Sequence, residues 1–410
     1  MVHRDGMAYA DRLGGIVSGL MNRMSILRTC AVTVLTALVL GSPNATFAAD
    51  ESYRVSATVD VGGIVLDIAV DQVTGTAYVL KWHGYETPQT YSLVIIDDAK
   101  ITAILPLGVS SSVAVDSGTH TAYVTASYAN KVLVIKGTSI TDEIAVDKQP
   151  RHVAVDSNSH TVFVSQELHG PGSDLVLINN GKVTSSLPSD AFISDIVVDS
   201  TTHTAYVRRE EGGTSYSDYA VITPVVNGVL GKDFGGEYPS ISSLAFDPVE
   251  QRLLFSSNSD LVQLKDGKFT LSPGFPWSGS ALEYDSETRT LFFLQDPTPG
   301  NPQYKYAVGA MKDGQYKSLG HFDSWGVKPA VDPVHDKVLV AEPGKILVLD
   351  NEWIDPRAPQ GRDADGFCGC FGQGWCGFLV VVPRQWEGCL ASPGARGLWL
   401  ERDVGANGSG

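Results

Sequence analysis

The sequence predicts an all-β protein, a seven-bladed β-propeller of four-stranded blades in which an N-terminal strand completes the last blade. Three observations predict this fold. A short pattern repeats seven times, the repeats contain strand-like apolar runs without a helical period, and the two ends of the repeat region complement each other. The chain has 410 residues, including 42 glycines, and only 19% of its residues are charged. This composition is typical of many short strands joined by tight turns.

Each repeat consists of an apolar run, an aspartate, a short turn and a second apolar run, as in SVAVDSGTHTAYVT, which begins at Ser112. Successive aspartates are 38 to 48 residues apart, which is the length of a four-stranded propeller blade. The first two strands are apolar on both faces, as expected of strands packed between neighbouring blades. Hairpins such as the one that begins at Ser92 supply the third and fourth strands. The seven aspartates are Asp71, Asp116, Asp156, Asp199, Asp247, Asp285 and Asp332.

The two ends of the repeat region predict how the ring closes. The seventh repeat has a third strand at residues 345–350 but no fourth strand before the composition changes. Residues 53–61 precede the first repeat and resemble a fourth strand, such as residues 101–107. If residues 53–61 pair with the last blade, the ring closes and no strand edge is left exposed at the seam.

The AVDxxxxTAYV signature, followed by an apolar hairpin and a glycine, resembles the YVTN-type repeat propeller family of exported proteins. The resemblance covers about 300 of the 410 residues and is strongest in the first four repeats. It implies a propeller fold in an exported protein. It does not imply an activity, because one fold carries many functions.

The N-terminal residues 1–48 are predicted to be a signal peptide. An apolar run of 13 residues, 29–41, follows Arg28 and precedes the small residues 45–49, an arrangement typical of secretory leaders. Met24 is a better start for such a leader than Met1, because residues 1–23 contain two aspartates. The apolar run is shorter than a membrane span of about 20 residues. We therefore expect a monomer that is secreted or held at the cell wall, without a stable membrane span.

Residues 354–410 are rich in Gly, Arg and Cys and contain four of the five cysteines. The cysteine spacings match no common zinc pattern. We interpret this tail as a disordered or out-of-frame segment, and we keep a disulfide-linked tail, and more remotely a metal site, as alternatives. The remaining residues, 50–353, contain no cysteine, which excludes thiol chemistry from the propeller.

The charge of the propeller region excludes several partners. The whole chain carries −16, residues 1–49 carry +2 and residues 354–410 carry −1, so residues 50–353 carry −17. Nucleic acids and anionic membranes would be repelled by such a surface. The chain contains no motif for a nucleotide, a haem or a catalytic serine, and we expect no cofactor.

The repeated polar residues are predicted to be structural. Each turn aspartate should accept backbone hydrogen bonds in its own turn. His120, His160 and His203 follow their aspartates by four residues, and His335 follows its aspartate by three. Their equivalent positions in the repeat make them turn residues as well.

The positions that differ between repeats are the candidate functional residues. The residues four before each aspartate should form a ring around the mouth of the central channel, because they begin the innermost strands. The loops between second and third strands should lie on the same face and add His83, Glu167 and Arg209. The ring residues are Asp67, Ser112, His152, Asp195, Ser243, Ala281 and Lys328. The predicted ligand-binding residues are Asp67, His152, Asp195, Lys328, Glu167, Arg209 and His83.

We predict a non-catalytic binding or interaction scaffold that uses the channel-mouth face to hold a protein or a cell-wall or surface ligand. The alternative is a metal-dependent enzyme similar to lactonase or lyase propellers, in which Asp67, His152, Asp195 and Glu167 would supply the acidic and histidine side chains. No spacing in the chain matches the motifs of those enzymes. A purely structural wall-associated protein is a third interpretation.

Overall fold

The computed structural model describes residues 55–84, 90–167, 173–210, 220–235, 241–257, 260–272, 279–295, 306–322, 327–351, 368–371 and 375–378. The chain divides into two units, Met1–Glu352 and Trp353–Gly410. In the second unit, β30 (Cys368–Phe371) and β31 (Trp375–Phe378) form an antiparallel pair. The predicted signal peptide lies outside the described residues, as does most of the predicted tail.

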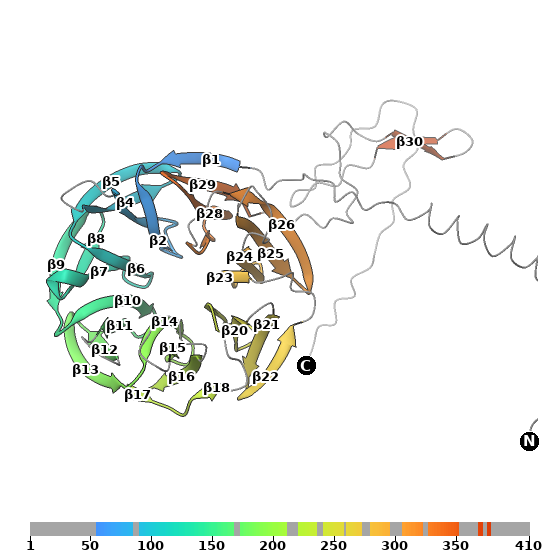
Figure 1. Cartoon of the computed structure of the whole chain (residues 1–410). Coiled ribbons are helices and arrows are strands. Elements are labelled where there is room, and N and C mark those ends of the chain that lie inside the picture. The colour runs from blue at the N-terminus through green and yellow to red at the C-terminus, as the bar shows by residue number, and fades with distance from the viewer. Residues whose placement is uncertain are drawn as a thin grey trace, which may run out of the picture. The chain divides into compact units, whose positions relative to one another are not determined.

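Seven antiparallel blades form a ring in the first unit, which confirms the predicted all-β propeller (Figure 1). Each blade runs from an inner strand beside the central channel to an outer strand at the rim. Blade 1 contains β2 (Ile64–Val70), β3 (Ala77–Trp82), β4 (Tyr91–Asp97) and β5 (Lys100–Leu107). Blade 2 contains β6 (Ser110–Asp116), β7 (Thr121–Ala126), β8 (Lys131–Lys136) and β9 (Ser139–Ala145), with a short 3₁₀ helix, η1 (Ser127–Ala129), between β7 and β8. Blade 3 contains β10 (Gln149–Asp156), β11 (Thr161–Glu167), β12 (Ser173–Asn179) and β13 (Lys182–Ser189).

The remaining blades repeat this plan. Blade 4 contains β14 (Phe192–Asp199), β15 (Thr204–Glu210), β16 (Ala220–Val226), β17 (Val229–Leu230) and β18 (Phe234–Gly235). Blade 5 contains β19 (Leu244–Asp247), β20 (Arg252–Ser257), β21 (Asp260–Lys265) and β22 (Lys268–Ser272). Blade 6 contains β23 (Gly279–Asp285), β24 (Thr290–Gln295), β25 (Tyr306–Lys312) and β26 (Gln315–Phe322). Blade 7 contains β27 (Ala330–Asp332), β28 (Lys337–Glu342), β29 (Lys345–Asp350) and β1 (Val55–Asp60).

The outer strand of blade 4 is divided into two pieces, β17 and β18, which both pair with β16. Pro224 in β16 has no N–H to donate to a partner strand, so the regular ladder is interrupted there. The N–H of Gly231 instead donates to the carbonyl of Pro224, with an N–O distance of 2.8 Å. A Cβ on Gly231 would lie only 2.9 Å from Cγ of Pro224, which explains the glycine at this position.

The N-terminal strand closes the ring as predicted. β1 pairs antiparallel with β29, with Val59 opposite Ile346. Beyond the strand, the N–H groups of Val61 and Gly62 both donate to the carbonyl of Gly344, at 2.9 and 2.7 Å. Blade 7 is therefore built from the two ends of the repeat region, and the outer edge of β29 is covered.

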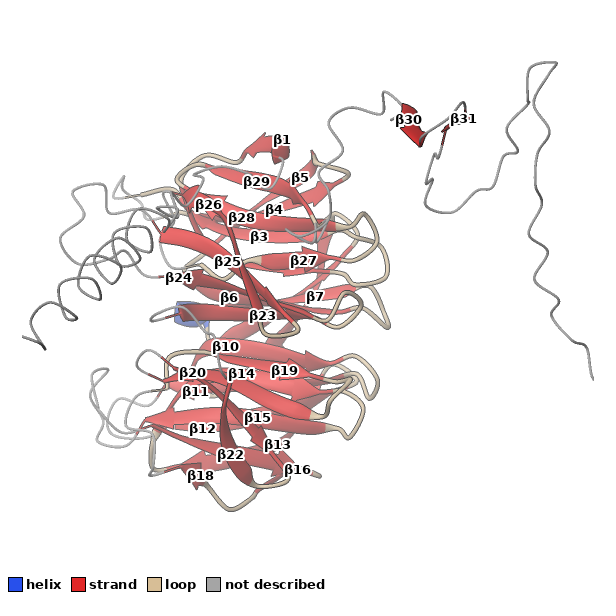
Figure 2. Ribbon diagram, turned by 90° about the vertical axis from the view of Figure 1, so that its right-hand side faces the viewer, coloured by secondary structure: helices blue, strands red, loops and turns tan. Residues whose placement is uncertain are grey.

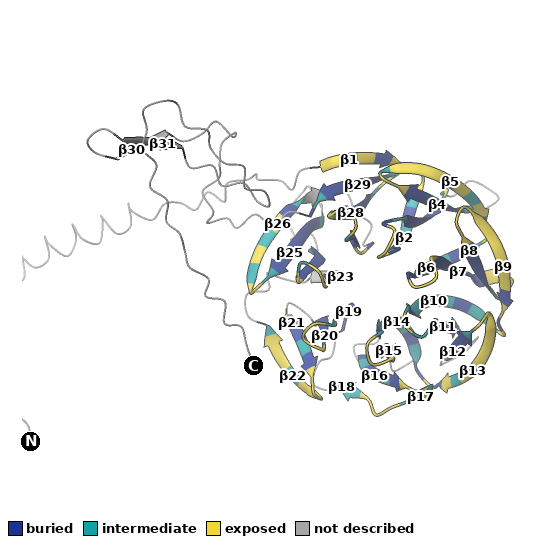
Figure 3. Cartoon of the chain, turned by 180° about the vertical axis from the view of Figure 1, so that it is seen from behind, coloured by how far each residue is buried: buried dark blue, intermediate teal, exposed yellow. Residues whose placement is uncertain are grey.

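The hydrophobic core lies between adjacent blades. Successive residues of a strand point to opposite faces, so Val79 packs in the cluster shared with blade 7, whereas Tyr78 and Leu80 pack in the cluster shared with blade 2. Figure 3 shows that the middle strands of the blades are mostly buried and that the outer strands are largely exposed. This arrangement explains why the first two strands of each repeat are apolar on both faces.

The turn aspartates accept hydrogen bonds in their own turns, as predicted, and some of them also contact a histidine of the next blade. In blade 2, Oδ1 of Asp116 accepts the N–H of Gly118 at 3.0 Å, and Oδ2 accepts the hydroxyl of Thr119 at 2.7 Å. The same carboxylate also contacts Nδ1 of His160, which belongs to the next blade, at 3.0 Å. His120 contacts Asp71, and His203 contacts Asp156, in the same way, at 2.8 and 2.7 Å. These three turn histidines therefore connect neighbouring blades, whereas His335 contacts Asp332 of its own turn at 2.7 Å.

The strands and their short turns account for nearly all of the regular structure in the described residues (Figure 2). Within those residues, no helix has the length and apolar character needed to cross a membrane.

Candidate functional site

The seven positions that the sequence placed around the channel mouth all line one central cavity of about 640 Å³. The inner strands of the blades surround the centre of the ring (Figure 1), and their residues line this open cavity. The structure therefore places Asp67, His152, Asp195 and Lys328 around this cavity.

The inner strands change register where they reach the cavity. In β2 the shift lies between Val65 and Asp67, and in β14 between Ile193 and Asp195. Similar shifts occur in β6, β10 and β23. A bulge of this kind redirects the side chains around it and is common beside binding sites. The bulges lie at or beside the ring residues.

Two ring carboxylates are used to join blades. Oδ2 of Asp67 accepts the N–H of Val113 and the hydroxyl of Ser112, both from blade 2, at 2.9 and 3.0 Å, and Oδ1 accepts the N–H of Ile68 at 3.0 Å. Burial raises the pKa of Asp67, and the nearby Lys328 ammonium and these hydrogen bonds oppose that increase.

Asp195 has the same arrangement in blade 4. Its Oδ1 accepts the N–H of Ile196 at 2.8 Å, and its Oδ2 accepts the N–H of Leu244 in blade 5 at 3.0 Å. Ser112 and Ser243 replace the carboxylate in blades 2 and 5. The N–H of Val153 donates to Ser112 Oγ at 3.4 Å, and the N–H of Leu282 donates to Ser243 Oγ at 3.0 Å. These ring residues satisfy the backbone of the following blade.

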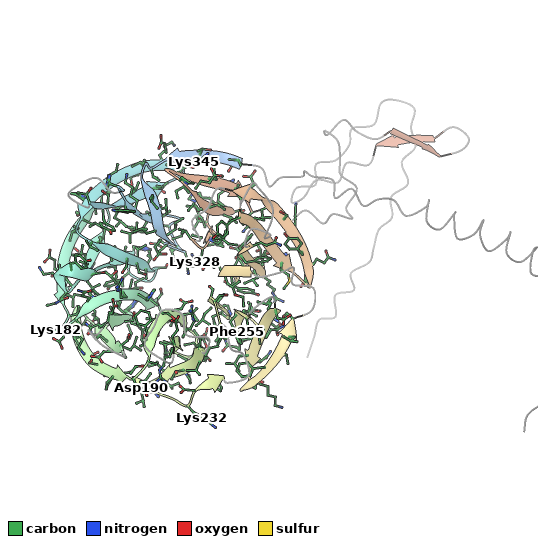
Figure 4. All side chains as sticks on the ribbon, viewed as in Figure 1. Lys182, Asp190, Lys232, Phe255, Lys328 and Lys345 are labelled. Carbon is green, nitrogen blue, oxygen red and sulfur yellow. The ribbon has the colours of Figure 1, made fainter. Side chains whose placement is uncertain are left out.

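Lys328 pairs with a residue that the sequence analysis did not identify. Its Nζ lies 3.0 Å from Oε2 of Glu283 in blade 6, and Figure 4 shows Lys328 beside the centre of the ring. The Glu283 carboxylate raises the pKa of Lys328, with smaller contributions from Asp67 and Asp195, whereas burial acts in the opposite direction. Lys328 is therefore protonated and positively charged at neutral pH.

Glu283 could have been found from the repeat. It lies two residues before the turn aspartate, where six of the seven repeats have Ala or Val. A glutamate at an otherwise small, apolar position of an inner strand indicates a specific role for that side chain.

His152 faces the same cavity from β10. Its backbone N–H donates to Ser165 Oγ at 3.1 Å, and no hydrogen bond of its imidazole is found among the described residues. Burial lowers the pKa of His152; the Asp195 carboxylate acts against this shift, and the Arg151 and Arg208 guanidinium groups reinforce it. The imidazole is therefore neutral at pH 7 and can both donate and accept a hydrogen bond.

The three loop candidates do not line the cavity. Nε2 of His83 lies 2.8 Å from Ser92 Oγ within blade 1, and Glu167 forms an ion pair with Arg151 on the mouth face.

Arg209 pairs with Asp190 and Asp233, toward the outer strands of its blade. Its neighbour Arg208 points the other way, donates to the carbonyl of Ser242 at 2.9 Å and pairs with Glu210. The sequence analysis placed Arg209 in the loop after the second strand, but β15 continues to Glu210. In a strand, adjacent side chains point to opposite faces of the sheet, so Arg208 and Arg209 face different neighbouring blades.

The acidic and histidine residues of the mouth do not form a metal centre. Among the described residues, no three His, Cys, Asp or Glu side chains converge as they would to hold a metal ion. Asp67, His152, Asp195 and Glu167 therefore lack the grouping that the metal-dependent enzyme alternative requires.

Comparisons with known proteins identify the fold. A chain of Kuenenia stuttgartiensis hydrazine synthase is similar with a TM-score of 0.55 and 11% identity, over 72% of this chain and 97% of that chain. The WD40 β-propeller domain of Doa1 is similar with a TM-score of 0.54 and 12% identity, over 74% of this chain and 98% of that chain. No protein-family model and no curated protein matches the sequence. The solved structures therefore support a seven-bladed β-propeller, and they add no support for the YVTN-type family.

Proposed function

We propose that this protein is an exported, non-catalytic binding scaffold that holds a partner at the channel-mouth face. β-Propellers commonly present one end of the ring to a ligand, because loops on a rigid scaffold can vary without loss of the fold. The export part of the proposal rests on the leader-like residues 1–48.

The observation that carries the proposal is the presence in the cavity of charged and polar groups that the backbone of the framework does not require. The N–H groups after the ring positions are satisfied by Asp67, Ser112, Asp195 and Ser243. His152 and Lys328 accept none of these N–H groups, and Lys328 pairs instead with Glu283 of blade 6; both line the cavity. Polar groups that converge in a cavity are candidates for ligand contacts.

A capture experiment tests the proposal. The full-length protein is immobilised and exposed to extracellular and cell-surface fractions of its own organism, and the bound material is quantified. Glu283→Gln combined with Lys328→Met alters the cavity, whereas Glu287→Gln alters an exposed glutamate in the turn of the same blade. We expect the double variant to lose most of the captured partner and Glu287→Gln to retain it.

Equal capture by wild type and the double variant would overturn the mouth as the binding face. Hydrolysis or elimination of a lactone substrate by the wild-type protein in the presence of Mg²⁺ or Ca²⁺ would overturn the non-catalytic assignment. Fractionation of the native cells with an antibody tests the location, and a purely cytoplasmic signal would overturn export.

A further inference from the structure

A second hollow on the mouth face adjoins the central cavity. It has a volume of about 690 Å³ and lies over blade 2 and its neighbours, with Tyr91, Tyr128, Gln149 and Arg151 among its lining residues. Leu66 and Ser111 line both this groove and the cavity. An extended ligand that occupies the groove could therefore reach the cavity past Leu66 and Ser111.

The groove carries an exposed aromatic anchor. Tyr128, in η1, is 73% exposed, and no other large hydrophobic side chain of the described residues is as accessible. Tyrosine offers a rigid apolar ring together with a hydroxyl, and it is enriched where proteins bind other proteins. The amide of Gln149 adds a donor and an acceptor of the kind that pairs with a peptide backbone.

The cavity favours a positive charge. Its lining contains the carboxylates of Asp67, Asp195 and Glu283, one cation in Lys328, and His152. Three carboxylates against one ammonium and a neutral imidazole make the lining acidic, and burial raises the pKa of Asp67 among them. The charged pairs at the edge, such as Arg208 with Glu210, cancel.

Asp195 retains capacity for a further donor. It accepts two backbone N–H groups, whereas a carboxylate has about four acceptor sites. Beside it, Ser194 Oγ and Arg208 Nε are buried and have no hydrogen-bond partner among the described residues. The side chain of Asp195 lines the cavity, so a ligand there can donate to its remaining acceptor sites.

We propose that the groove and the cavity together bind an extended peptide segment of a partner protein, whose lysine or arginine side chain enters the cavity towards Asp195 while a neighbouring residue packs on Tyr128. This inference rests on the proposed function and names the partner's chemistry. A free polyamine would satisfy the cavity but would leave Tyr128 unused, so the peptide accounts for both features.

The test uses the full-length protein and acetylated, amidated hexapeptide libraries that differ only in one fixed central residue, Lys, Arg, Gln or Glu. Binding is measured by fluorescence anisotropy at two salt concentrations. We expect the Lys and Arg libraries to bind about tenfold more tightly than the Gln library, with the preference reduced at high salt. The Glu library should bind most weakly.

Variants locate the contacts. Tyr128→Ala should weaken binding of the basic libraries about tenfold, as loss of an interface anchor does. Glu283→Gln removes a negative charge from the cavity and breaks the ion pair with Lys328, but it leaves the backbone hydrogen bonds accepted by Asp67 and Asp195 in place, so it should also weaken binding. Asp195→Asn should also weaken binding of the basic libraries, and a melting curve of this variant checks that it is folded. Glu287→Gln, on an exposed turn, is the matched control and should bind as wild type does.

Several results would overturn the inference. Equal binding of the basic and Glu libraries would remove the charge argument. Spermidine that binds tightly and is unaffected by Tyr128→Ala would assign the cavity to free amines, and maltohexaose that binds in place of the peptides would assign the groove to saccharides. If the peptides fail while the wild-type mouth still captures a native partner, the inference is wrong and the proposed function stands.

Discussion

The seam between blade 7 and blade 1 should determine the stability of the ring. Val59 and Val61 are 5% and 4% exposed, and both belong to a core cluster that also contains Ile68 of blade 1 and Ile346 of blade 7. Replacing both valines with alanine removes two methyl groups from each of two buried sites. Each replacement should cost about 2 kcal/mol, since a buried methylene is worth about 0.8 kcal/mol before the cavity that remains is counted.

The double variant Val59→Ala/Val61→Ala should therefore lower the free energy of unfolding by about 4 kcal/mol, a large part of the usual 5–15 kcal/mol. Guanidinium chloride unfolding followed by tryptophan fluorescence measures the change. Val55→Ala, in the same strand but 46% exposed, should change the free energy by less than about 0.5 kcal/mol. A loss below about 1 kcal/mol in the double variant would refute the claim that β1 holds the ring closed.

Three further predictions concern the opposite face. His203→Ala removes the contact with Asp156 in the preceding blade and should cost about 1–2 kcal/mol in chemical unfolding. Gly75→Ala should lower the melting temperature, because the new Cβ would lie 2.5 Å from His335 Nδ1 at a φ of +74°; Gly137→Ala, with a φ of +57° and open space around it, shows the cost of the backbone conformation alone. Stability should also depend on pH at both ends of the scale. Burial alone would raise the pKa of Asp156, but the hydrogen bonds to its carboxylate lower it below 3.8, so its contribution is present above that value and is lost as the pH falls through the lowered pKa. The hydrogen bond to its aspartate raises the pKa of His335 above 6.5, so its contribution is complete below that value and is lost as the pH rises through the raised pKa; His335→Ala should flatten the alkaline side of a melting-temperature profile.

The fold could be predicted from the sequence because the same strand and turn pattern occurs seven times. A strand boundary that is ambiguous in one blade is supported by the equivalent positions in six others, and the missing strand of the last blade matches the surplus strand before the first. The exception in blade 4 arises from a single proline, Pro224, whose effect depends on which strand lies beside it. That information is absent from the repeat pattern.

The candidate site was only partly predictable. Equivalence of repeats was sufficient to place Asp67, His152 and Asp195 around one cavity. It could not show that the turn histidines contact the preceding blade, because that contact depends on the spacing between blades. Nor could it separate Arg208 from Arg209, because the choice depends on whether the strand or the loop includes them.

The ring itself explains which of its residues are free to bind a ligand. Asp67 and Asp195 each accept two N–H groups, one from their own strand and one from the following blade. Without Asp67, the N–H of Ile68 would need an acceptor from the ring residue of the preceding blade, which is Lys328. Without Asp195, the N–H of Ile196 would need one from His152 in the same way.

In blade 7 the residue after the ring position is Pro329, which has no N–H, so Ala281 in blade 6 needs no acceptor. The six N–H groups after the ring positions are thus satisfied by two carboxylates and two serines, Ser112 and Ser243. A carboxylate that accepts N–H groups from two blades frees its neighbour from that task, and the freed side chains, a lysine and a neutral histidine, line the cavity with the other ring residues. Selection on ligand binding can therefore act on Lys328 and His152 without loss of the backbone hydrogen bonds at the ring positions.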